Sequence, residues 1–232
     1  MRNFIQILFL ALLIGCSGCY RDRFPVTPRV AEASTFIVQV DYKGMGLGMV
    51  TGTAWSVDEH HLVTAGHVCV ASDGKDVVVS DRTRNFRARP ILWENSETNG
   101  DADLCVLVAL GVSLKDPLII SDRMPNVGEK VWTVGYPLGQ FAHSNGKYLG
   151  DLDGKDSSMN DNSIDAPCDR GASGSSVYIE DGVFGVLVRM RTDGGFVHDG
   201  KDGCAVIGLK PLREILDLAG VDYDLTPHVP VE

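Results

Sequence analysis

Residues 171–190 read GASGSSVYIEDGVFGVLVRM. A glycine-rich turn is followed by two apolar runs, 175–180 and 183–190, and the pair Asp181-Gly182 stands between them. An Asp-Gly pair between apolar runs is a strong hairpin signal, because glycine reaches the positive φ that a tight hairpin turn requires. This stretch therefore predicts an antiparallel pair of strands that starts at a tight turn carrying Ser173.

Short apolar runs of the same kind occupy most of the chain. Before residue 112 there are about six, separated by Gly, Asp and Asn turns: 36–40, 48–57, 61–64, 77–79, 86–92 and 104–110. That number is the expected content of one small antiparallel barrel. A second series follows residue 126, at 130–136, near 147–150, in the hairpin above and at 204–208. The sequence therefore predicts an all-β fold with two such groups of strands.

One helix is expected after the last strand, over about residues 211–219. Pro211 suits its first turn, and Gly220 can end it. Its apolar face is predicted to contain Leu212, Ile215, Leu216 and Leu218.

Composition excludes one large class of partner. The net charge is −10 and the isoelectric point is about 5.0. Binding of nucleic acid requires a basic surface, so we expect no nucleic-acid partner.

The N-terminus has the pattern of an export signal. Arg2 is followed by an apolar run of about a dozen residues, 4–14, which is shorter than the roughly 20 residues that span a membrane. The run ends in Leu13-Ile14-Gly15-Cys16, which looks like a bacterial lipobox. We expect a lipoprotein signal peptide over residues 1–15, lipid attached to Cys16, and an extended tether over residues 16–34. The protein would then be exported to the cell envelope and anchored to a membrane, or secreted if the signal is an ordinary one cleaved near Gly18.

Four groups needed for acyl transfer are present: a nucleophile, a base, a group that orients the base, and donors for the oxyanion. Ser173 lies between Gly171 and Gly174, which let the backbone turn tightly and approach a substrate carbonyl, so that the amides of Gly171 and Ser173 can point at the oxyanion. His67 ends an apolar strand, and Asp103 begins another that reads as buried. Asp101, in the turn 99–101, is the alternative to Asp103 as the acid.

The order His67, Asp103, Ser173, with spacings of 36 and 70 residues, resembles the trypsin/chymotrypsin-like peptidases, particularly their HtrA-like branch. The motifs that carry the resemblance are 51–55, 64–68, 103–107, 127–139 and 165–174. It implies two packed six-stranded antiparallel β-barrels with a short C-terminal helix, in a peptidase domain of residues 35–222. Barrel one would span about 35–112 and barrel two about 126–209, and residues 223–232 would form a tail.

The same resemblance implies the roles of the site residues. His67, Asp103 and Ser173 would form a catalytic triad, and the amides of Gly171 and Ser173 would bind the oxyanion. The expected reaction is hydrolysis of protein or peptide substrates without a cofactor. The alternative is a non-catalytic, surface-anchored binding module on the same fold.

Four departures from the family pattern limit what the resemblance implies. Ser175 and Ser176 stand where Gly-Pro is usual, at the start of a strand. About a dozen residues remain after Gly220, so no PDZ-like domain is expected. Ala172 replaces an aspartate of animal trypsins, so activation by a freed N-terminus is not expected. Pro167 stands near the position of the aspartate that gives trypsin its preference for basic residues. A preference for basic substrate residues is therefore not indicated.

Four cysteines follow the export segment: Cys69, Cys105, Cys168 and Cys204. They allow two disulfides and three pairings, and buried free thiols are the alternative. The family resemblance implies a bridge between Cys168 and Cys204 across the walls of the substrate pocket. No zinc-like spacing occurs, so no metal site is expected.

Overall fold

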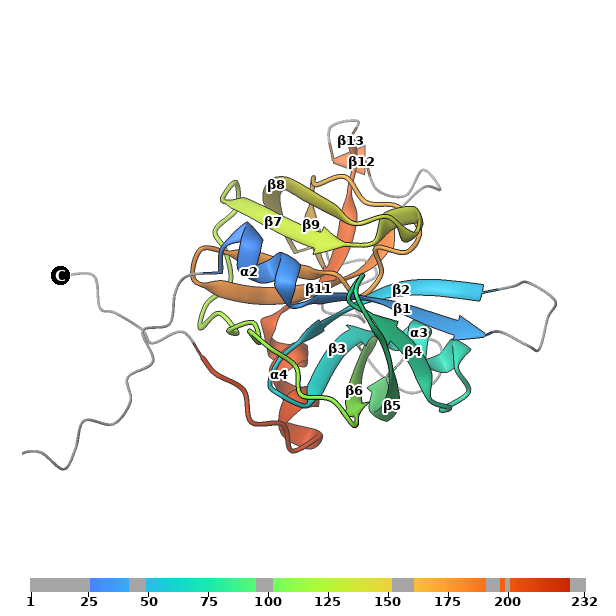
Figure 1. Cartoon of the computed structure of the whole chain (residues 1–232). Helices are drawn as coiled ribbons and strands as arrows, with labels where there is room; N and C mark the ends of the chain where they lie inside the picture. The colour runs from blue at the N-terminus through green and yellow to red at the C-terminus, as the bar shows by residue number, and fades with distance from the viewer. Residues whose placement is uncertain are drawn as a thin grey trace, which may run out of the picture.

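The computed structural model describes residues 26–41, 49–94, 102–151, 161–190, 197–198 and 201–225. Two closed barrels of six antiparallel strands each pack against one another, and the predicted fold class is confirmed (Figure 1). The predicted signal peptide over residues 1–15 and the predicted lipid attachment at Cys16 lie outside the described residues. Within the described part of the chain, no helix is both long and apolar enough to cross a membrane.

The first barrel closes in the order β1-β2-β3-β6-β5-β4. Some of its strands alternate between buried and exposed side chains, as in Asn85–Glu94, where every second side chain from Phe86 to Pro90 is buried. Others are buried on both faces, as in Leu104–Leu110. The bounds are β1 Thr35–Asp41, β2 Met49–Ser56, β3 His61–Ala65, β4 Val77–Ser80, β5 Asn85–Glu94 and β6 Leu104–Leu110.

The second barrel closes in the order β10-β11-β14-β9-β8-β7. The predicted hairpin is present, with Ile179 paired to Gly182 across its turn. The bounds are β7 Lys130–Gly135, β8 Ala142–Asp151, β9 Asp161–Ile164, β10 Ser176–Ile179, β11 Gly182–Met190 and β14 Cys204–Ile207. A short 3-10 helix, η1, covers Pro137–Gly139, and a small separate sheet pairs β12 (Val197–His198) with β13 (Lys201–Asp202).

The core runs from one barrel into the other. On β11, Phe184 and Leu187 belong to the interior of the second barrel, whereas Val186 and Val188 belong to a cluster shared with the first. Both faces of β11 are thus buried, which explains why its sequence is a nearly continuous apolar run. The two barrels therefore pack against one another through this shared cluster.

The C-terminal helix α4 spans Leu209–Leu218, close to the predicted range, and contacts β6 and β11. Leu212, Ile215 and Leu216 are buried as expected. Leu218 was wrongly placed on the buried face, because 72% of it is exposed. Ala219, the next residue, packs against the core, so Leu218 is turned away from it, because successive helical residues point about 100° apart. The helix ends at Ala219, and Gly220 follows with φ +67°.

The expected extended tether of residues 16–34 is wrong for its last third. Residues 28–33 form helix α2 (Pro28–Ala33), which lies beside β7 in Figure 1. Thr27 accepts a hydrogen bond from the amide of Val30, and proline at the first helical position is pre-set for a helix. Ala31 is fully buried, so this segment belongs to the domain.

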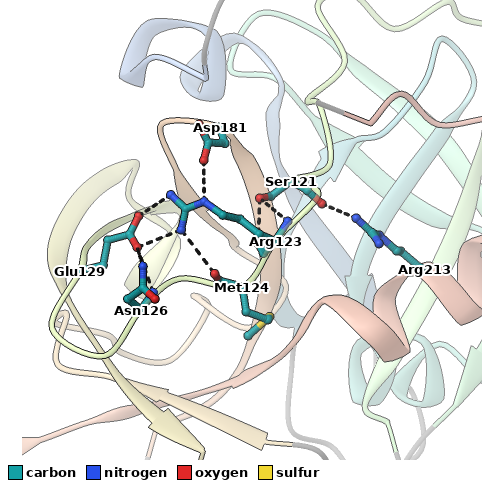
Figure 2. A network of polar contacts seen from close by, with 7 residues as sticks. All are labelled: Ser121, Arg123, Met124, Asn126, Glu129, Asp181 and Arg213. Carbon is teal, nitrogen blue, oxygen red and sulfur yellow. Dashed lines mark hydrogen bonds and ion pairs between the residues drawn. The ribbon is translucent and has the colours of Figure 1, made fainter. Parts of the chain in front are cut away.

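Two arginines, Arg123 and Arg213, hold the segment that connects the barrels, between β6 and β7 (Figure 2). Arg123 bonds both carboxylate oxygens of Glu129, at 2.8 and 3.0 Å, and Asp181 in the β10–β11 turn at 2.9 Å. Ser121 accepts a bond on its carbonyl from Arg213 of α4 at 2.7 Å. The connection is thereby tied to the hairpin that leads away from Ser173.

Candidate active site

A histidine and an aspartate form a two-point contact at the edge of the first barrel. The Nδ1 atom of His67 is 2.7 Å from Oδ2 of Asp103, and the backbone N–H of His67 donates to Oδ1 of the same carboxylate at 2.7 Å. The Asp103 side chain is 6% exposed and the His67 side chain 39%. Because a carboxylate only accepts, Nδ1 carries the proton in this contact and Nε2 is left as the basic nitrogen.

Strand pairing explains why these two residues meet. β3 and β6 are antiparallel neighbours, and Ala65, the last residue of β3, is paired with Leu104, the first of β6. The residues just outside this pair, after β3 and before β6, therefore emerge at one end of the barrel. His67 follows in a short helix, α3 (Gly66–Ala71), which the sequence analysis did not predict because six residues are too few for a periodic pattern.

Gly66 is required by this close approach. A Cβ atom on Gly66 would stand 2.8 Å from Oδ1 of Asp103 and 2.9 Å from the amide nitrogen of Leu104, and it would overlap the carbonyl oxygen of Glu94. Only glycine therefore allows the carboxylate to reach the His67 amide.

Ser173 comes from the second barrel and reaches the same place. Its carbonyl accepts a 2.8 Å hydrogen bond from the amide of Thr53 on β2. Gly174, with φ +91°, leaves no space for a Cβ beside Thr53, Thr64 and the amide of Ala65. The turn that carries Ser173 thus packs against the end of β3, two residues before His67.

The hydroxyl of Ser173 points to its own barrel. Its Oγ donates to the carbonyl of Val188 on β11 at 3.5 Å, and within the described part of the chain no hydrogen bond joins it to His67. A nucleophilic serine gives its proton to the histidine base, and catalytic hydrogen bonds often tighten only when substrate is bound.

Two backbone amides of the turn that carries Ser173 point away from the hydrogen bonds made by their own peptide carbonyls. The carbonyl of Arg170 accepts from Leu138 N and that of Ala172 from Ser175 N, at 2.6 and 2.9 Å. The C=O and N–H of a trans peptide point in opposite directions, so the N–H groups of Gly171 and Ser173 point the other way. Among the described residues neither amide has an acceptor. A pair of unbonded donors of this kind can hold an oxyanion.

Thr53 is a buried residue of this site that sequence reasoning missed. Its Oγ1 donates to the carbonyl of Gly171 at 2.8 Å and accepts from the amide of Tyr136 at 2.9 Å. It therefore ties the first barrel to both loops that flank the amide pair. A signal existed, since a polar residue between small ones on an otherwise buried strand needs hydrogen-bond partners. Burial raises the pKa of the neighbouring Tyr136, whose phenol stays neutral.

The four cysteines of the domain form two disulfides. Cys69 is bonded to Cys105, and Cys168 to Cys204, with Cα–Cα distances of 6.4 and 6.3 Å. The first bridge lies in the barrel of His67 and Asp103, and the second in the barrel of Ser173. Each closes a separation of 36 residues.

Asp101, the alternative acid, lies outside the described residues. In the described ranges no three His, Cys, Asp or Glu side chains gather as metal ligands would.

The chain is similar to known proteins in sequence and in fold. The family model described as "Trypsin-like peptidase domain" matches residues 50–185. The fold is similar to that of the Rv3671c protease from M. tuberculosis in its active form, with TM-score 0.67 and 18% identity over 87% of this chain and 90% of that one. The inactive form of the Rv3671c protease gives TM-score 0.61 and 18% identity, over 86% of this chain and 98% of that one. No sequence among the curated proteins matches the chain.

Proposed function

Because this chain belongs to the family of trypsin-like peptidases, we propose that it is a serine endopeptidase whose catalytic triad is His67, Asp103 and Ser173. The observation that carries the proposal is the 2.7 Å contact between His67 Nδ1 and Asp103, beside a serine turn with two unbonded amides. Membership of the family implies protein or peptide substrates.

The proposed reaction has two steps, acylation of Ser173 and hydrolysis of the resulting ester. Ser173 Oγ attacks the carbonyl carbon of the scissile bond while His67 Nε2 takes its proton, and the amides of Gly171 and Ser173 bind the oxyanion. The C–N bond then breaks, and the imidazolium gives the proton to the leaving amine. Water attacks the resulting ester by the same route, which releases the acid and restores Ser173. Asp103 holds the imidazole in the required tautomer.

The second candidate is a non-catalytic binding module on the same fold. The observation in its favour is that the Ser173 hydroxyl bonds Val188. The two candidates differ in what a reactive serine probe does, because only an activated serine attacks a fluorophosphonate.

The test is labelling with a fluorophosphonate, followed by mass spectrometry of the modified peptide. The enzyme proposal expects one label, on Ser173, and loss of labelling in Ser173→Ala and His67→Ala. Asp103→Asn is expected to label far more slowly, whereas its control Asp101→Asn labels at the wild-type rate. An unlabelled wild-type protein with a folded domain would support the binding module. Damage by Asp101→Asn alone would move the role of the acid to that residue.

The export of the protein is the second part of the proposal. Two disulfides are typical of proteins outside the reducing cytosol. We propose that diacylglycerol on Cys16 anchors the domain to a membrane. Cys16→Ala is expected to release the protein into the soluble fraction, with fluorophosphonate labelling of the domain unchanged. A wild-type protein that is already soluble, with its N-terminus after residue 16, would show an ordinary secretory signal.

A further inference from the structure

The helix that carries His67 is short and has no side-chain cap at its N-terminus. α3 is six residues long, and no side chain caps its N-terminus, where Ala65 stands. Isolated helices of this length are unstable, because one turn fixes several residues for few hydrogen bonds. The position of His67 therefore depends on contacts from α3 to the rest of the barrel.

Two of those contacts run from α3 to the start of β6 in the same register. Asp103 accepts the His67 amide and contacts its ring, and Cys69 is bonded to Cys105 two residues further along both segments. The separation is 36 residues in each case. The hydrogen bonds and the disulfide thus form adjacent cross-links between the same two pieces of chain.

The bridge is enclosed, whereas the imidazole is not. Cys69 and Cys105 are fully buried, and the His67 side chain is 39% exposed. At the C-terminal end of the helix, the carbonyl of Cys69 accepts from both the amide and the hydroxyl of Ser72, at 3.0 and 2.7 Å. A covalent link at Cys69 therefore fixes the turn of helix that directly follows the base.

We propose that the Cys69–Cys105 disulfide is a positioning element that holds His67 and Asp103 in register, and that it acts on the rate of the chemical step. The inference rests on the proposed peptidase function. It predicts more than stabilisation, since misplacing a catalytic group by about 1 Å lowers a rate by up to about 100-fold.

The chain contains a matched control for this experiment. The Cys168–Cys204 bridge closes a loop of the same length, so either bridge restricts the unfolded chain to the same extent. It lies in the other barrel and does not touch the His67–Asp103 pair. The variants to compare are Cys69→Ala with Cys105→Ala, and Cys168→Ala with Cys204→Ala.

Three readouts test the proposal on the full domain. Removing Cys69 and Cys105 is expected to lower kcat about 10- to 100-fold, with KM within about twofold of the wild type. It is also expected to abolish or shift the deshielded NMR resonance of the proton between His67 Nδ1 and Asp103. The control variant should keep that resonance, whatever happens to its kcat and KM, because its bridge is expected to join the walls of the substrate pocket. In an Asp103→Asn background, loss of the first bridge should cost little further activity, because the interaction it supports is already gone.

The opposite results would overturn the inference. An unchanged kcat or an unchanged proton resonance without the first bridge, or additive losses in the Asp103→Asn background, would each make the bridge merely stabilising. If the alanine pair does not fold, Cys69→Val with Cys105→Ala keeps more of the buried volume and is measured below its melting temperature. The proton resonance needs no turnover, so it tests the inference even if the wild type fails to react with a fluorophosphonate, an outcome that would refute only the proposed function.

Discussion

At the scale of single residues, the proposed chemistry depends on Ser173. Ser173→Ala is expected to lower kcat by about 10⁴- to 10⁶-fold with little change in melting temperature, because a triad acts as a unit. His67→Ala should cost about as much, and the double variant little more than either. Steady-state hydrolysis of a peptide library, with circular dichroism as the control for folding, measures this. Independent, multiplicative losses in the double variant would contradict the proposed triad.

Gly66 makes a second prediction at this scale. Gly66→Ala is expected to destabilise the fold and to lower activity, because the new methyl group would displace the Asp103 carboxylate or the Glu94 carbonyl. Overpacking of this kind typically costs about 1–3 kcal/mol. The control is Gly203→Ala, where the nearest atoms would stand at 3.3 and 3.4 Å and need move only slightly. Thermal unfolding of the two variants would refute the argument if their melting temperatures fell equally.

Among the secondary-structure elements, the segment between β6 and β7 is held by the contacts of Arg123 with Glu129 and Asp181 (Figure 2). The hydrogen bond from Arg123 lowers the pKa of the Glu129 carboxyl below its usual value, against a smaller opposing effect of burial. Glu129 also accepts from the amide of Asn126 at 2.9 Å. This arrangement stabilises the turn before β7 only while Glu129 is ionised.

The depressed pKa fixes the direction of the pH dependence. The contribution is complete above the unfolded pKa of glutamate, about 4.3, and is lost as the pH falls through the lower folded value. Glu129→Gln should therefore melt below the wild type at pH 7, and the gap should close below about pH 4. Glu214→Gln, at an exposed ion pair of 3.9 Å, is the control and should show a small difference throughout. A gap for Glu129→Gln that does not change between pH 3 and pH 7 would exclude this explanation.

At the scale of the whole molecule, the shared core predicts that the barrels unfold together. Val134, Val186 and Val188 of the second barrel pack in the same cluster as Trp55 of the first. Trp55 is fully buried in barrel one, and Trp132 stacks on Tyr178 in barrel two. Trp93 is in β5 of barrel one, so a variant with fluorescence from barrel two needs both Trp55→Phe and Trp93→Phe. Denaturant titrations of Trp132→Phe and of this double variant should each show one transition when followed by fluorescence and by circular dichroism, and in each variant the two midpoints should coincide. Distinct midpoints for the two probes in one variant would show that the barrels are independent units.

Local signals in the sequence determined much of the secondary structure. Apolar runs ended by Gly, Asp or Asn predicted most strands, and Asp181-Gly182 predicted the β10–β11 hairpin, because a tight turn and its strands involve neighbouring residues only. Pro28 after Thr27 was a helix signal of the same local kind. It was read as part of a tether, since a helix of six residues has no visible period.

The site depended on tertiary structure, for a physical reason. The spacing of His67, Asp103 and Ser173 and the family resemblance pointed to these residues, and their catalytic roles stay predictions. Their juxtaposition comes from the pairing of β3 with β6, which are not consecutive in the chain, and from the packing of Gly174 on β3. Pairing between distant strands is decided by barrel closure and the shared core. Local sequence patterns were therefore sufficient for most strands, the β10–β11 turn and the candidate residues. Strand β9 was not predicted, and the contacts among the side chains and amides of the site depend on the closed barrels.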